Sequence, residues 1–143
     1  MVVQFFGLDA INRNNIAKAF ADETNSVFCT DRELPMASLE AQFARWLRTI
    51  AGVFQRNKIN DIVLSGYFPS IEARQQFKDM NMLGPIITVW VDTINPEDAI
   101  VPEGPKATTD FKWESPEESE YDFKISNLEE VENVLAQVKE KLI

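Results

Sequence analysis

VVQFFGLDAINRNNIAKAFA, residues 2–21, is the stretch that decides the fold. Its first five residues are mostly apolar and rich in β-formers, and Gly7 ends the run, which predicts a buried strand. A loop to about Arg13 is predicted next. From there on apolar side chains recur at helical spacing, with Asn14 or Asn15 available as the N-cap. The stretch therefore predicts a strand, a loop and a helix in that order.

The same alternation continues along the rest of the chain. Further strands are predicted at residues 26–30, 61–65, 85–91 and 121–125. Further helices are predicted at residues 38–56 and 70–80 and from residue 127 on, with a short turn at 95–98 and a surface excursion at 103–120. Each parallel crossover needs a helix, so this order implies a parallel sheet covered on both faces. We expect a three-layer α/β/α fold with a mostly parallel five-stranded sheet, in one domain over residues 1–143.

Composition and charge limit the class of protein. A chain of 143 residues, 45% of them hydrophobic, is long enough for one compact core. The formal charge of −9 repels nucleic-acid phosphates and anionic lipid heads, so neither nucleic acid nor a membrane is expected as a partner. Cys29 is the one cysteine and is expected to be buried, and there is no histidine, so no disulfide and no metal site is expected. Without a long apolar run or a signal segment, the chain is predicted to be cytoplasmic.

The first strand-to-helix loop is where an open α/β sheet binds a nucleotide phosphate. The phosphate-loop motif asks for Gly, four residues, Gly, Lys and then Ser or Thr. This chain keeps Gly7 and has Asn12, Arg13 and Asn14 at the last three positions. Asn12 can adopt a left-handed backbone conformation. Arg13 has a broad planar guanidinium where the motif has the compact ammonium group of lysine, and Asn14 has an amide where the motif has a hydroxyl that binds Mg²⁺. Asp9 would repel ATP, and a plain turn without a ligand remains the alternative.

Gly7-Leu8 followed by residues 16–21 resembles the GLSGAGKTTIAKAL opening of the adenylylsulfate kinase family, with the central residues replaced. Further similar segments follow in the same order over nearly the whole chain. They are residues 28–32, 45–54, 62–69 with 72–74, 89–93 and 110–117. The resemblance implies a P-loop kinase-like fold and transfer of the ATP γ-phosphate to adenylylsulfate, with ATP and Mg²⁺ as cofactors only if the chain is active.

The resemblance also implies roles for individual residues. Asp31 would be the catalytic carboxylate that accepts the proton of the substrate hydroxyl. The phosphate loop would be formed by Gly7, Asn12, Arg13 and Asn14. The substrate would be bound by Arg32, Arg45, Phe68, Pro69 and Arg74, with the arginines on its anionic groups. A plainer interpretation stays open for Asp31 as a helix cap and for Arg45 and Arg74 as members of ion pairs.

The chain also departs from the family, since residues 94–106 are too short for the basic lid that closes over ATP. Phosphoryl transfer depends on positioning and charge neutralisation, so our leading hypothesis is a catalytically inactive or impaired protein that acts as a binding or interaction module, with a small anionic or nucleotide ligand. The alternative is an active kinase in which Arg13 replaces the lysine and Asp31 or Asp92 holds the metal. A third hypothesis is a subunit, in a homodimer or docked onto another protein through the acidic residues 114–122 or through an apolar helix face.

Overall fold

A computed structural model describes residues 2–30, 48–49, 51–53, 55–56, 61–68, 70–79, 85–94 and 113–142. Its elements are β1 (Val2–Phe6), α1 (Ala10–Thr24), β2 (Val27–Thr30), β3 (Ile62–Gly66), α3 (Ile71–Lys78), β4 (Ile86–Val91), η4 (Glu118–Glu120), β5 (Phe123–Ile125), η5 (Leu128–Glu130) and α5 (Val131–Lys141). All five predicted strands are confirmed. The predicted turn at 95–98 and most of the helix at 38–56 lie outside the described residues. Within the described part of the chain, no helix is long and apolar enough to cross a membrane.

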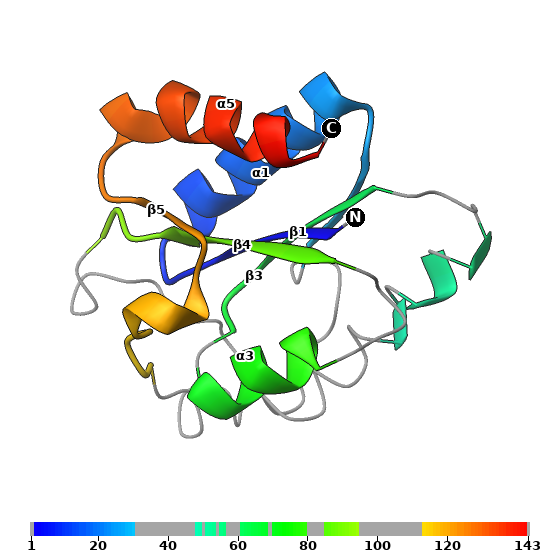
Figure 1. The fold of residues 1–143 in the computed structure, drawn as a ribbon, viewed down its shortest axis with the longest axis horizontal. Helices are drawn as coiled ribbons and strands as arrows, with labels where there is room; N and C mark the ends of the chain where they lie inside the picture. Colours follow the sequence, from blue (N-terminus) through cyan, green and yellow to red (C-terminus); the bar gives the residue numbers. More distant parts are fainter. Residues whose placement is uncertain are drawn as a thin grey trace.

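The five strands form one parallel sheet in the order β2-β3-β1-β4-β5. Helices α1 and α5 cover one face of this sheet and α3 covers the other, as Figure 1 shows. The predicted three-layer α/β/α fold with a parallel five-stranded sheet is therefore confirmed. The chain leaves β1 toward β2 on one side and leaves β3 toward β4 on the other side. The C-terminal ends of β1 and β3 thus form the switch point at which open α/β sheets bind ligands.

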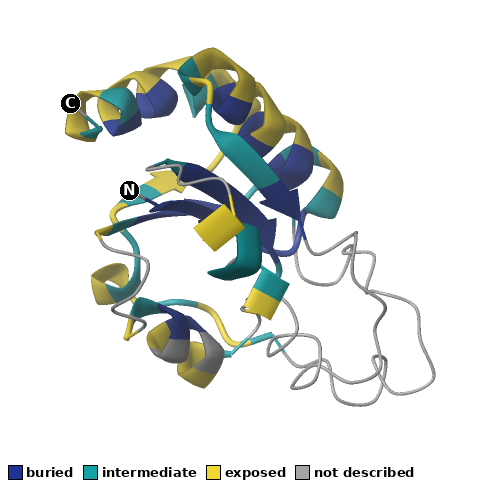
Figure 2. Cartoon of the chain, turned by 90° about the vertical axis from the view of Figure 1, so that its right-hand side faces the viewer, coloured by how far each residue is buried: buried dark blue, intermediate teal, exposed yellow. Residues whose placement is uncertain are grey.

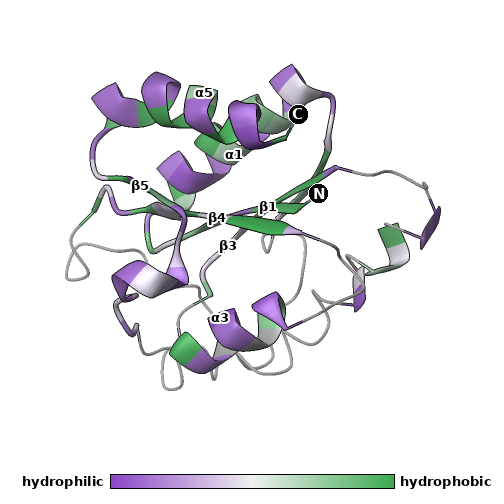
Figure 3. Cartoon of the chain, viewed as in Figure 1, coloured by the Kyte–Doolittle hydropathy of each residue, from purple (hydrophilic) through white to green (hydrophobic). Residues whose placement is uncertain are grey.

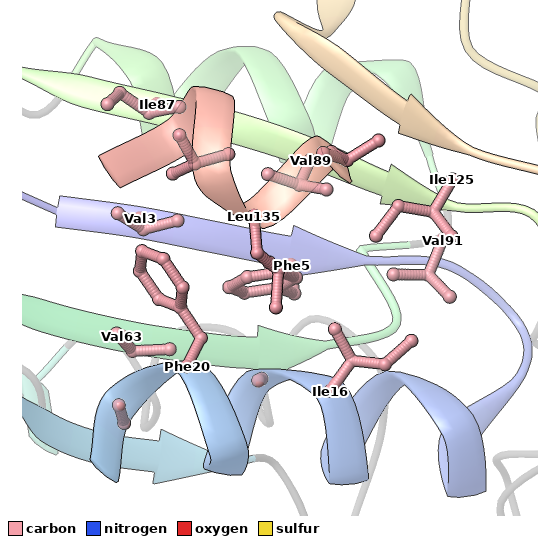
Figure 4. Close-up of a cluster of buried hydrophobic side chains, with 14 residues drawn as sticks. Val3, Phe5, Ile16, Phe20, Val63, Ile87, Val89, Val91, Ile125 and Leu135 are labelled. Carbon is pink, nitrogen blue, oxygen red and sulfur yellow. The ribbon is translucent and has the colours of Figure 1, made fainter. Parts of the chain in front are cut away.

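The core has two parts because successive side chains of a strand point to opposite faces of the sheet. In β1, Val3 and Phe5 face α1 and α5, whereas Val2 and Phe6 belong to the cluster on the α3 face. Phe20 of α1 packs edge-on against Phe5 with ring centroids 5.8 Å apart (Figure 4). Figure 2 shows the buried strands between the helix layers, and Figure 3 shows that the strands are apolar and the outer faces of the helices polar. Both faces of the sheet are therefore buried, as expected for a parallel sheet.

Helix α1 begins about one turn earlier than the sequence predicts. Its first residue is Ala10, and Asp9 is its N-cap. The predicted loop to Arg13 and the predicted cap at Asn14 or Asn15 are therefore wrong. The cause is that the first buried positions of the helix are polar, so the hydrophobic spacing starts only in its second turn. This early start decides the shape of the candidate phosphate site.

Candidate functional site

A three-residue turn, residues 7–9, joins β1 to α1, and we call it the β1–α1 turn. Gly7 has a φ of 140°, and a Cβ atom there would lie 2.3 Å from the carbonyl oxygen of Val91, so only glycine fits. The backbone N–H of Arg13 donates to the carbonyl of Asp9 at 2.8 Å, as in a regular helix. A phosphate-binding nest needs successive N–H groups free to point at an anion. Here the residues that would form such a nest, from Ala10 on, belong to the first turn of α1.

The carboxylate of Asp9 lies at the N-terminus of α1, where a phosphate would be favoured by the helix dipole. Its Oδ1 accepts from the backbone N–H of Asn12 at 3.1 Å. Its Oδ2 accepts from Asn12 Nδ2 and from Thr93 Oγ1, each at 2.7 Å. Burial alone would raise the pKa of Asp9, but the hydrogen bonds from Thr93 and Asn12 and the charge of Arg13 outweigh it and hold the pKa below its usual value. Asn12 is helical, so the left-handed backbone that an asparagine allows at this position does not occur.

The side chain of Arg13 is fully buried, with 0% of its surface exposed. Its Nη1 donates to the carbonyl of Gly7 at 2.6 Å, and its Nε donates to Ser65 Oγ at 2.9 Å. The guanidinium carbon lies 4.4 Å from the centre of the Tyr67 ring, within range of a cation–π interaction. The guanidinium therefore joins the β1–α1 turn to the end of β3 from inside the protein.

Asn14 extends this network to β2. Its Oδ1 accepts from Thr30 Oγ1 at 3.1 Å and from Ser65 Oγ at 2.5 Å. Its Nδ2 is buried and has no hydrogen-bond partner among the described residues. The oxygen is the one amide atom that could bind Mg²⁺, and two hydroxyl groups already donate to it. The ends of β1, β2 and β3 are thus tied together by side chains of the protein itself.

Arg74 is similarly enclosed, with 2% of its surface exposed. Its Nη1 donates to the carbonyl of Phe68 and its Nη2 to the carbonyl of Glu114, each at 2.7 Å. Its Nε forms an ion pair with Glu120 at 2.9 Å, and its guanidinium carbon lies 5.3 Å from the centre of the Trp113 ring. Burial alone would raise the pKa of Glu120, and the hydrogen bond and charge of Arg74 lower it below its usual value. Arg74 therefore fastens the segment before β5 to α3.

The other predicted site residues lie in the core, just after β4, or in the undescribed part of the chain. Phe68 has a φ of 44° and packs against Phe77 with ring centroids 5.1 Å apart, on the α3 face of the sheet. Asp92, at the end of β4, pairs with Lys124 at 3.5 Å. No cluster of metal-ligating residues occurs in the part of the chain that the structure describes. The remaining predictions stay open because their residues lie outside it: Asp31, Arg32, Arg45 and Pro69.

Solved structures of several kinases are similar to this fold. A gluconokinase from Sinorhizobium meliloti 1021 has a TM-score of 0.62 and 13% identity, over 99% of this chain and 94% of the kinase. A shikimate kinase from Aquifex aeolicus vf5 has a TM-score of 0.56 and 14% identity, over 99% and 96%. A hexameric APS kinase from Thiobacillus denitrificans has a TM-score of 0.60 and 17% identity, over 99% of this chain but 28% of that chain.

These likenesses define the class of fold. The chain has a P-loop kinase-like α/β fold, with the strand order and helix layers described above. No protein-family model matches the sequence, and no curated protein matches it either. Kinases for gluconate and shikimate resemble the chain about as closely as the APS kinase does, so the resemblance to adenylylsulfate kinases in particular is not confirmed.

Asp9→Ala is expected to lower the free energy of unfolding by about 1–2 kcal/mol, because it removes the cap of α1 and the bond from Thr93. Urea denaturation measures this. The folded pKa of Asp9 lies below the unfolded value of about 3.9, so the carboxylate stabilises the fold above that pH, and the contribution is lost as the pH falls through the folded pKa.

The difference between wild type and Asp9→Ala should therefore be largest near neutral pH and shrink in acid. Asp22→Ala is the control, because Asp22 is an exposed carboxylate on the same helix. Its effect is expected to stay within about 0.5 kcal/mol. A loss of stability in Asp9→Ala that does not depend on pH would contradict the capping role.

Proposed function

We propose that this chain keeps the fold of a P-loop kinase, does not transfer phosphate from ATP, and acts as a binding or interaction module. One observation carries the proposal: the N-terminus of α1 is capped by the chain's own Asp9 and not left open for a phosphate. Thr93, beyond the end of β4, also donates to this carboxylate, so the arrangement is supported from two sides. A triphosphate at this position would face a like charge.

The side chains around the β1–α1 turn do not fit Mg-ATP. A P-loop kinase needs a cationic side chain on the phosphates and an oxygen ligand for magnesium. Nε and Nη1 of Arg13 donate to groups of the protein, and Oδ1 of Asn14 accepts from two hydroxyl groups. To form a phosphate loop, the first turn of α1 would have to unwind and the buried guanidinium would have to turn outward. Each buried partner left unsatisfied would cost about 1–3 kcal/mol.

The active-kinase alternative assigns the role of the lysine to Arg13. The two hydrogen bonds of that residue to Ser65 and Gly7 weigh against this alternative, since a phosphate would have to compete with both. The same reasoning applies to Arg74 as a substrate-binding residue, because its three donor atoms already have acceptors in the protein. The hydrogen bonds of both arginines therefore support a structural role for each of them.

Calorimetric titration with Mg-ATP and with adenylylsulfate tests the proposal. We expect no binding heat and no rise of the thermal midpoint, because only a bound ligand stabilises the folded state. Ligand at 100 times its dissociation constant would add about 2.7 kcal/mol, which a thermal scan detects readily. A P-loop kinase of known activity, assayed in parallel, is the positive control. Tight nucleotide binding together with phosphate transfer would refute the proposal.

A further inference from the structure

A pocket of about 240 Å³ lies beside the β1–α1 turn, where β4 ends. The described residues that line it include two tryptophans, Trp90 and Trp113, together with Leu8, Ser115 and the acidic residue Asp92. Pockets for drug-sized ligands measure roughly 300–1,000 Å³, so this one suits a smaller molecule. We propose that it binds a small organic cation, an amine or a methylated ammonium group with few heavy atoms.

The charge of the pocket argues for a cation. Among the described residues that line it, Asp92 is the one acidic or basic residue, and its side chain is a carboxylate. The faces of indole rings carry negative potential and attract ammonium groups, and aromatic walls of this kind recognise quaternary ammonium ligands. The chain as a whole has a formal charge of −9, which also draws cations toward its surface. An anion would find no lysine or arginine among these wall residues.

The protein itself places an ammonium group beside two of the lining residues, and this group belongs to Lys124, which does not line the pocket. Lys124 Nζ lies 3.5 Å from Asp92 Oδ2 and 4.6 Å from the centre of the Trp90 ring. Lys124 is the neighbour of Trp90 across the β4–β5 pair, so the sheet register brings the two together. The Lys124 side chain is 37% exposed, and exposed ion pairs are worth little, so a ligand can displace this ammonium at small cost. The contacts of Lys124 thus show that Asp92 and Trp90 together can hold an ammonium group.

The second indole, that of Trp113, packs against the guanidinium of Arg74, whose position is fixed by hydrogen bonds. The guanidinium of Arg74 lies against Trp113 and is fixed by hydrogen bonds to Phe68, Glu114 and Glu120. The carboxylate of Glu120 neutralises its charge at 2.9 Å, so Arg74 repels an incoming cation only weakly. Trp113 therefore has a fixed position in the wall of the pocket, whereas the ammonium group of Lys124 beside the pocket can be displaced.

Binding is tested with choline and with dimethylbutanol, its uncharged carbon isostere, followed through the indole N–H signals in NMR spectra. We expect saturable shifts of the Trp90 and Trp113 signals with choline, and about tenfold weaker binding of the isostere. This inference does not depend on the fate of ATP, since different ligands test the two. Equal affinities for choline and its isostere, or no saturable shift at tens of millimolar choline, would overturn it.

Two variants with opposite expected effects on the affinity for choline extend the test. Asp92→Asn should weaken choline binding about tenfold, because it removes the counter-charge. Lys124→Met should tighten binding about threefold, because it frees both the carboxylate and the face of Trp90. Lys139→Met makes the same charge change on α5, where the lysine pairs with Glu23, and should leave the affinity within about twofold. If Lys124→Met and Lys139→Met bind choline equally well, Lys124 does not compete with the ligand for Asp92 and Trp90, and the proposal fails.

Discussion

Arg13→Ala is expected to lower the free energy of unfolding by about 3–5 kcal/mol, a large part of the total stability of a small protein. The substitution leaves a cavity where a fully buried side chain was. It also removes the donors of Ser65 Oγ and of the Gly7 carbonyl, and buried acceptors without a donor are costly. Urea denaturation of the ligand-free protein measures the loss.

Arg13→Lys separates charge from shape at this position. A lysine keeps the positive charge but cannot reproduce the planar fork that reaches Ser65 and Gly7 together, so we expect a loss of about 1–3 kcal/mol. Lys18→Ala is the matched control, because Lys18 is an exposed cation on the same helix, and it should change stability by less than about 0.5 kcal/mol. If Arg13 served only to bind phosphate, its removal would leave the stability of the ligand-free protein unchanged. If Arg13→Ala is as stable as the wild type without ligand, the guanidinium is not a structural tie.

Arg74→Met is the second substitution with a large expected effect, about 3–4 kcal/mol. Methionine retains much of the apolar stem but leaves Glu120 without its cation in a partly buried site, and loss of one partner of a buried ion pair is strongly destabilising. The carbonyls of Phe68 and Glu114 lose their donors as well. Thermal and urea unfolding measure the change.

The same variant should also loosen the segment that Arg74 fastens. We expect the indole of Trp113 to become more exposed to water, with faster hydrogen exchange in η4, while α1 and its contacts to the sheet keep their protection. Gln75→Ala on the same helix is the control, since that side chain is exposed and donates a hydrogen bond to Asp79, one turn further along the helix. Uniform loss of protection over the whole sheet would contradict a local tie.

The position of the candidate site could be predicted from the sequence, but the burial and the contacts of its residues could not. A glycine after a buried strand marked the switch-point loop correctly, because that position follows from chain order in any such sheet. The polar identity of Arg13 and Asn14 suggested exposure to a ligand, whereas both are buried. Their partner Ser65 lies 52 residues from Arg13 in the chain, and Trp113, Glu114 and the rest of that segment gave no local signal that an arginine of α3 would hold them.

What the sequence alone determined is the class of fold: the apolar strands, the helices between them and the parallel sheet, because periodicity and turn residues are local properties of the chain. Tertiary structure alone decided which groups surround the first loop. Some of these groups come from distant segments: Thr93 donates to the carboxylate of Asp9, the N-cap of α1, across 84 residues of sequence. Local patterns cannot specify such a contact, because it exists only after the sheet brings the ends of β1 and β4 side by side.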